Sequence, residues 1–95
     1  MPAYLFVNIE ITDPEKYAEY IKVVPPTLEK FNGKYLVRAG KTVKLEGTYE
    51  PKRTVILQFP SMEQAQAWWN SNEYQVPKAI RQAASKTDMI LVEGL

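Results

Sequence analysis

The chain has 95 residues, with 12 basic residues against 11 acidic ones, a net charge of +1, and neither cysteine nor histidine. This composition excludes disulfides and Ser-His-Asp or Cys-His catalysis, and it removes the usual ligands of zinc, haem and iron–sulfur sites, so we expect no metal and no cofactor. Balanced charge and the lack of a long apolar run predict one domain over residues 1–95 that binds neither nucleic acid nor membrane and resides in the cytoplasm.

The N-terminal part of the chain predicts a strand followed by a helix. Residues Ala3–Ile11 alternate between apolar and mixed side chains, as in a strand with one buried face. Asp13 can cap a helix that has Pro14 at its first position. Because proline has no amide hydrogen, Pro25-Pro26 is expected to break this helix, and a second short helix is expected over about residues 26–31.

Two further strands are predicted next. Lys34–Ala39 alternates, which places Arg38 on the sheet face opposite to the helices, and Gly40 permits a bulge or bend. Residues 42–46 alternate more weakly. Arg53–Phe59 has the strongest strand pattern in this part of the chain.

The C-terminal part predicts helices and a closing strand. Ser61 and Gln64 have the spacing of a capping box at a helix start. A further helix is expected from about Asn72 to Ser85, with an irregular first turn at Pro77, and Thr87–Glu93 is the last strand. The order β-α-β-β-α-β predicts an α+β fold of the ferredoxin-like type.

One face of the predicted sheet is too apolar to face water. The helices would cover the face that carries Leu5, Val7 and Ile9. The opposite face would carry Tyr4, Phe6, Leu36 and Ile56, interspersed with Asn8, Glu10, Arg38 and Gln58. An apolar patch of this kind usually marks an interaction site, so we predict a homodimer that stacks the two sheet faces. The alternative is a monomer with aromatic residues scattered on its surface.

The chain resembles the domain of unknown function 1330 family, within the dimeric α+β barrel superfamily. The stretches that carry the resemblance cover nearly the whole chain: YAEYIKVVPPTLEKFNGKYLVRAG, EGTYEPKRTVILQFPS, AWWNSNEYQ, IRQAAS and ILVEG. Two departures from the family pattern are visible. Ala39-Gly40 replaces a common Gly-Gly, and Ser71-Asn72-Glu73-Tyr74 replaces a common Ser-Pro-Glu-Tyr.

The resemblance implies a fold and a dimer but no agreed reaction. The superfamily includes cofactor-free monooxygenases of aromatic polyketides, haem-degrading enzymes and muconolactone isomerases. Haem degradation of that type relies on a histidine, so a chain without histidine is a poor candidate for it.

The adjacent tryptophans are candidates for a pocket wall or for the core. On a helix from Met62, Trp69 shares a stripe with Met62 and Ala65, whereas Trp68 lies about 100° away from Trp69. We therefore predict that Trp69 mainly packs in the core and that Trp68 borders a cavity or a subunit contact near Tyr74. Core packing of both rings is the alternative.

Polar side chains supply the other ligand-binding candidates. Ser71, Tyr74 and Arg81 can line one side of the last helix, where a tyrosine beside an arginine could hold a carboxylate or enolate. Alternatively, they are a helix cap, a half-buried tyrosine and a surface arginine. Arg38 could bind a small acidic ligand or form an ion pair with Glu10.

Three functions remain open from the sequence. The first is a small dimeric protein that binds an aromatic or carboxylated metabolite between sheet and helices. The second is a cofactor-free monooxygenase or isomerase, which would need a polar-tipped pocket with Asn8, Arg38, Tyr74 or a tryptophan. The third is a structural or regulatory dimer without a pocket.

Overall fold

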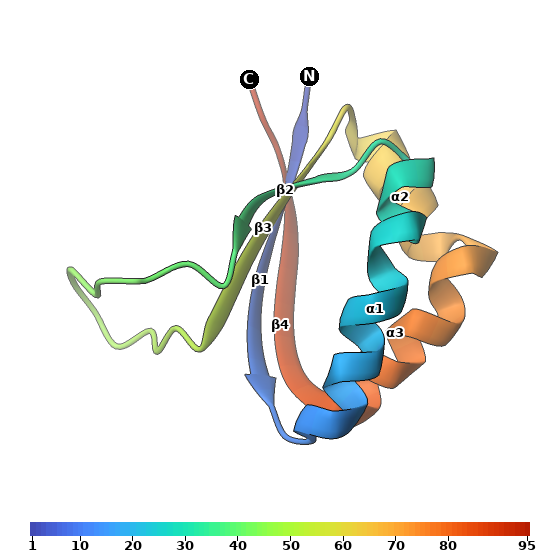
Figure 1. Ribbon diagram of the computed structural model, residues 1–95. Coiled ribbons are helices and arrows are strands. Elements are labelled where there is room, and N and C mark those ends of the chain that lie inside the picture. Colours follow the sequence, from blue (N-terminus) through green and yellow to red (C-terminus); the bar gives the residue numbers. More distant parts are fainter.

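Two layers make up the structure, a four-stranded sheet and three helices on one of its faces (Figure 1). The computed structural model describes residues 1–95. The elements in chain order are β1 (Ala3–Ile11), α1 (Pro14–Lys30), β2 (Lys34–Arg38), β3 (Arg53–Phe59), α2 (Met62–Asn70), α3 (Asn72–Ala84) and β4 (Ser85–Glu93). The strands are antiparallel, in the order β2-β3-β1-β4. The predicted α+β, ferredoxin-like fold is confirmed.

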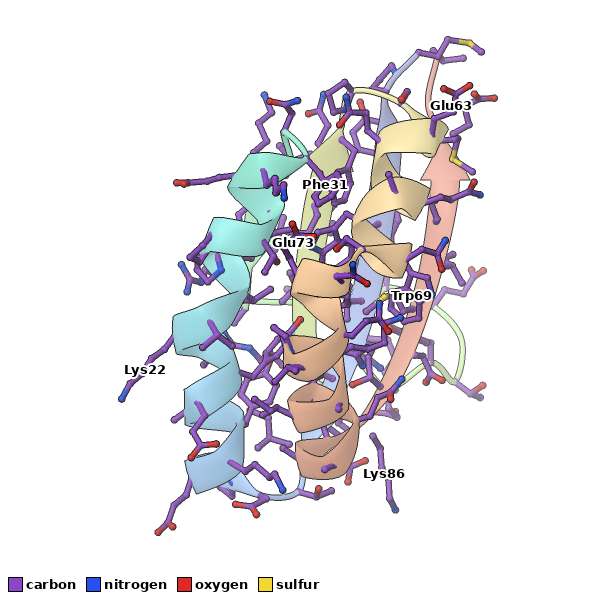
Figure 2. The ribbon with its side chains drawn as sticks, turned by 90° about the vertical axis from the view of Figure 1, so that its right-hand side faces the viewer. Lys22, Phe31, Glu63, Trp69, Glu73 and Lys86 are labelled. Atoms are coloured by element: carbon purple, nitrogen blue, oxygen red, sulfur yellow. The ribbon has the colours of Figure 1, made fainter.

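The core lies between the sheet and the helices. Leu5, Val7 and Ile9 of β1 point toward the helices and are buried, as the alternation predicts. Residues directly opposite each other in an antiparallel pair share a face, so Val55 and Leu57 of β3 join them. Figure 2 looks onto the helix layer, with α1 and α3 side by side in front of the sheet.

Helix α1 continues through its two prolines, so the predicted break is wrong. Its inward stripe is buried along the whole length: Tyr17, Tyr20, Val24, Thr27 and Leu28. Burial of this stripe stabilises the helix beyond Pro25-Pro26, although both prolines lack the amide hydrogen of a helical bond. The Thr27 hydroxyl donates to the Val24 carbonyl oxygen at 2.7 Å.

Side chains cap the helices where the sequence predicts. The Asp13 carboxylate accepts from the Lys16 amide at 3.2 Å, and the Ser61 hydroxyl accepts from the Gln64 amide at 3.1 Å. At the other end of α1, Asn32 adopts a left-handed φ of 61° and the Gly33 amide donates to the Leu28 carbonyl at 2.8 Å.

A bulge in β2 changes the face on which Arg38 lies. The register runs from Tyr35 opposite Leu57 to Val37 opposite Ile56 and Arg38 opposite Val55, with the irregularity at Leu36. Val55 is buried against the helices, so Arg38 lies on the helix-covered face with Tyr35. The prediction that it lies on the open face, within reach of Glu10, is wrong because the extra residue reverses the alternation.

The face without helices, called the open face below, is crossed by an apolar row of Val37, Ile56, Phe6 and Ile90, one residue from each strand. Phe6 is 43% exposed and Ile90 is 62% exposed. Residues 39–52 form an arm that projects away from this face (Figure 1). Residues 42–46, which alternate in sequence, pair with no strand.

None of the helices combines the length and the apolar composition that a membrane crossing requires.

Candidate functional site

A small cavity lies between the sheet and the helices. Its volume is about 40 Å³. Every helix and every strand contributes to its wall, and we call it the helix-side cavity. Its lining residues are Leu5, Val7, Ile9, Tyr17, Tyr20, Ile21, Val24, Tyr35, Arg38, Arg53, Val55, Leu57, Trp68, Arg81 and Met89.

The cavity wall carries positively charged side chains and no carboxylate. All arginines of the chain, Arg38, Arg53 and Arg81, line it, and no Asp or Glu does. The ion pairs of the chain join lysines to glutamates, Lys30 to Glu73 and Lys44 to Glu50, so no arginine takes part. A guanidinium cannot lose its proton in a protein, so the cavity wall carries uncompensated positive charge.

Arg81 is the most buried of these arginines, with 4% of its surface exposed. Its Nε donates to the Tyr74 hydroxyl at 3.2 Å, and the Tyr74 hydroxyl lies 2.9 Å from the Tyr20 hydroxyl. Helix α3 therefore places Arg81 and Tyr74 in contact, seven residues apart, and α1 brings Tyr20 to them. The predicted pairing of Tyr74 with Arg81 is present, and it is buried.

Burial keeps the cavity tyrosines in their neutral form. It raises the pKa of Tyr20 far above its ordinary value, and the neighbouring Tyr74 adds to this increase. Burial also raises the pKa of Tyr17, against an opposing effect of Arg53, and the pKa of Tyr35, against an opposing effect of Arg38. At neutral pH these hydroxyls are hydrogen-bond donors and not phenolate bases.

Arg38 and Arg53 lie at the side of the cavity that is nearest to solvent. Arg38 is exposed, with its guanidinium carbon 4.7 Å from the centroid of the Tyr35 ring. Arg53 is half-buried, with the same atom 5.7 Å from the centroid of the Tyr17 ring. The Arg53 Nε is buried without a hydrogen-bond partner, which leaves one donor available for an oxygen atom.

The prediction that Trp69 is the main core residue is wrong, whereas Trp68 borders the helix-side cavity near Tyr74, as predicted. Trp68 is 1% exposed, its Nε1 donates to the Thr27 hydroxyl at 3.0 Å, and its ring lies 4.0 Å from that of Tyr74. Trp69 is partly buried, between the helices and β4 (Figure 2). The Lys78 ammonium lies 3.9 Å from the centroid of the Trp69 ring. Trp68 is therefore the core residue of the two, and one side of it forms part of the cavity wall.

Two other candidates lie outside the cavity. Asn8 points to the open face, where its amide oxygen accepts from the Lys52 amide at 2.7 Å and its amide nitrogen donates to the Glu50 carbonyl at 3.3 Å. It therefore fixes the base of the arm. Ser71 caps α3, accepting from the Tyr74 amide at 3.2 Å and donating to the Trp68 carbonyl at 2.8 Å.

The sequence analysis missed Tyr17, Tyr20, Tyr35 and Arg53 as members of the site. A signal for the first two exists, because tyrosines at inward positions of an amphipathic helix carry a hydroxyl that needs a partner in the core. The positions of Tyr35 and Arg53 depend on the register of the sheet and could not be found in this way.

Comparison with known proteins bears on the family of this chain. A family model described as a domain of unknown function (DUF1330) matches residues 2–95. The chain belongs to this family. The resemblance noted from the sequence is thereby confirmed. Among curated protein sequences, none matches the chain.

Solved structures share the fold of this DUF1330 chain. A protein of unknown function from Rhodopseudomonas palustris has a TM-score of 0.82 at 20% identity, over 99% of this chain and 82% of that one. SnoaB, a cofactor-independent oxygenase from Streptomyces nogalater, has a TM-score of 0.60 at 11% identity, over 99% of this chain and 93% of that one. At these identities the likeness establishes the fold alone.

Proposed function

We propose that this protein binds a small carboxylate in the helix-side cavity. The observation that carries the proposal is the convergence of every arginine of the chain on a cavity without an acidic residue. A buried charge without a partner costs free energy, and an anionic ligand would remove that cost. The cysteine-free chain fits a reducing cytoplasm, which is the compartment we propose.

The size of the cavity favours a carboxylate over an aromatic ligand. A cavity of about 40 Å³ has room for roughly three water molecules, because one water needs about 10–15 Å³. A cavity that binds benzene measures about 150 Å³. The cavity therefore holds the carboxylate group of the ligand, and any longer part of the ligand extends toward Arg38 and solvent.

The chemistry of the cavity favours binding over the alternative of a cofactor-free monooxygenase or isomerase. Such a reaction needs a base that removes a proton, and the titratable groups on the wall are arginines and tyrosines, of which Tyr17, Tyr20 and Tyr35 have raised pKa values. Guanidinium and neutral phenol groups can bind an anion, but they do not remove a proton from a substrate.

Acetate should raise the melting temperature of the protein, and acetamide at the same concentration should not. The two molecules have nearly the same shape, and only acetate carries the charge that the arginines can pair with. At about 100 times its Kd, a ligand adds about 2.7 kcal/mol of stability. Thermal unfolding at constant ionic strength, adjusted with sodium chloride, measures the effect. Equal shifts with acetate, acetamide and chloride would contradict the proposal and favour a structural dimer without a ligand.

We also propose that the protein is a homodimer that stacks its open faces. The support is an apolar row whose exposure to water is unfavourable, formed by Val37, Ile56, Phe6 and Ile90. The arm adds exposed apolar side chains, including Leu45, which is 92% exposed. Together, the arm and the open face enclose a concavity of about 710 Å³. A second copy would fill it.

Replacing Phe6 with glutamate should convert the dimer to a monomer. The carboxylate would be desolvated at the centre of the apolar row in the dimer but solvated in the monomer, so folding is retained. Val76→Glu is the control, because Val76 is an exposed apolar residue on the helix layer, away from the proposed interface. Light scattering at micromolar concentration distinguishes the outcomes. A wild-type monomer, or a Phe6→Glu dimer, would contradict the proposed interface.

A further inference from the structure

The hydrogen bonds beside the cavity form a chain with a defined direction. Tyr74 accepts from the Arg81 Nε and shares one hydrogen with Tyr20. If Tyr20 donated that hydrogen, the Tyr74 hydrogen would be left in a fully buried position with no acceptor. A buried donor without an acceptor destabilises the protein, because it loses its hydrogen bond to water and gains none in return. The arrangement of lowest cost therefore has Arg81 donating to Tyr74 and Tyr74 donating to Tyr20.

The free end of this series of hydrogen bonds is at Tyr20. Tyr20 lines the helix-side cavity, whereas Tyr74 does not. Once Tyr20 accepts from Tyr74, its own hydrogen has no partner within the protein and has the cavity as its remaining direction. The positive charge of Arg81 polarises both hydroxyls in the same sense, which strengthens Tyr20 as a donor.

We propose that Tyr20 is the ligand-contacting residue of this cavity and selects an anionic oxygen atom, and that Tyr74 is a positioning residue that transmits the charge of Arg81 to it. This inference rests on the proposed function, because it concerns the same ligand. It goes further by naming Tyr20 as the residue that distinguishes a carboxylate from a neutral ligand such as an amide. Burial raises the pKa of Tyr20, so this residue donates a hydrogen bond to the ligand and does not act as a base.

A double-mutant cycle tests whether Tyr74 acts through Tyr20. Acetate binding is measured by isothermal titration calorimetry for wild type, Tyr20→Phe, Tyr74→Phe and the double variant. We expect Tyr20→Phe to weaken binding about ten-fold, as for the loss of one hydrogen bond to a charged group. Tyr74→Phe should weaken it two- to five-fold, and the double variant should bind as weakly as Tyr20→Phe. Tyr49→Phe, in the exposed arm, is the control and should bind as wild type does.

The outcomes separate this inference from the proposed function. No acetate binding by wild type overturns both. Acetate binding that Tyr20→Phe leaves unchanged overturns the inference alone. An equal effect of Tyr74→Phe with and without the Tyr20 hydroxyl overturns the role of Tyr74.

A measurement on the wild-type protein covers the case in which the variants fail to fold. Carbon-13 labelling of the tyrosine Cζ atoms reports hydrogen bonding at each hydroxyl. Titration with acetate should move the Tyr20 resonance most, and acetamide should leave it in place. If acetate binds and the Tyr20 resonance does not move, the inference is wrong.

Discussion

Replacing Arg81 with methionine is expected to remove most of the stabilisation by acetate while leaving the ligand-free protein at least as stable as wild type. Arg81 is buried, its guanidinium has one neutral hydroxyl as a hydrogen-bond partner, and the centroid of the Trp69 ring lies 5.9 Å away. Replacement of an unpaired buried charge by an apolar side chain of similar volume is often neutral or stabilising. The Tyr74 hydroxyl keeps its bond to Tyr20. Loss of a charged hydrogen bond of about 2 kcal/mol corresponds to roughly thirty-fold weaker binding.

Lys78→Met is the matched control for this change. Lys78 lies one helical turn before Arg81 on α3 and carries the same charge, but it does not line the helix-side cavity. Its loss should leave the acetate effect intact. Urea denaturation with and without acetate gives both quantities for each variant. A large loss of ligand-free stability in Arg81→Met would show that Arg81 is mainly structural, and an unchanged acetate effect would place the ligand elsewhere.

The sequence determines the fold through local patterns that act independently of the rest of the chain. Strict alternation in Ala3–Ile11 and Arg53–Phe59 predicts the two central strands, and Asp13 and Ser61 mark helix starts by the bonds they make. These signals fail where packing overrides a local preference. The prolines of α1 are tolerated because the stripe around them is buried on both sides of the break that they would otherwise cause.

The candidate site was harder to predict because it depends on register. Tyr74 and Arg81 lie on one helix, so their spacing alone brings them together. Arg38 reaches the same cavity because one extra residue at Leu36 reverses the face of everything after it. No composition or spacing within β2 marks that bulge. The glycine that suggested one, Gly40, lies after the strand has ended.

Replacing Trp68 with alanine should reduce the free energy of unfolding by about 3–5 kcal/mol, a large part of the stability of a small domain. The ring packs against Phe59, at a centroid distance of 5.5 Å, and against Tyr74. Its loss leaves a void in the core. It also removes the donor to the Thr27 hydroxyl, which lies where α1 passes its two prolines. The substitution therefore weakens the packing of both α2 and α1.

Trp69→Ala is the control within the same helix, and it should reduce the free energy of unfolding by about 1–2 kcal/mol. Trp69 keeps part of its surface in water, and its contact with the Lys78 ammonium contributes about 0.5–1 kcal/mol. Periodicity could not assign the two rings, because both lie within one turn of Ala65, the buried residue that marks the inner face of α2. The Thr27 hydroxyl on α1 accepts from Trp68 and thereby selects it as the core residue. Urea denaturation of both variants tests this: equal losses of stability, or a larger loss for Trp69→Ala, would show that α2 is rotated relative to the arrangement described.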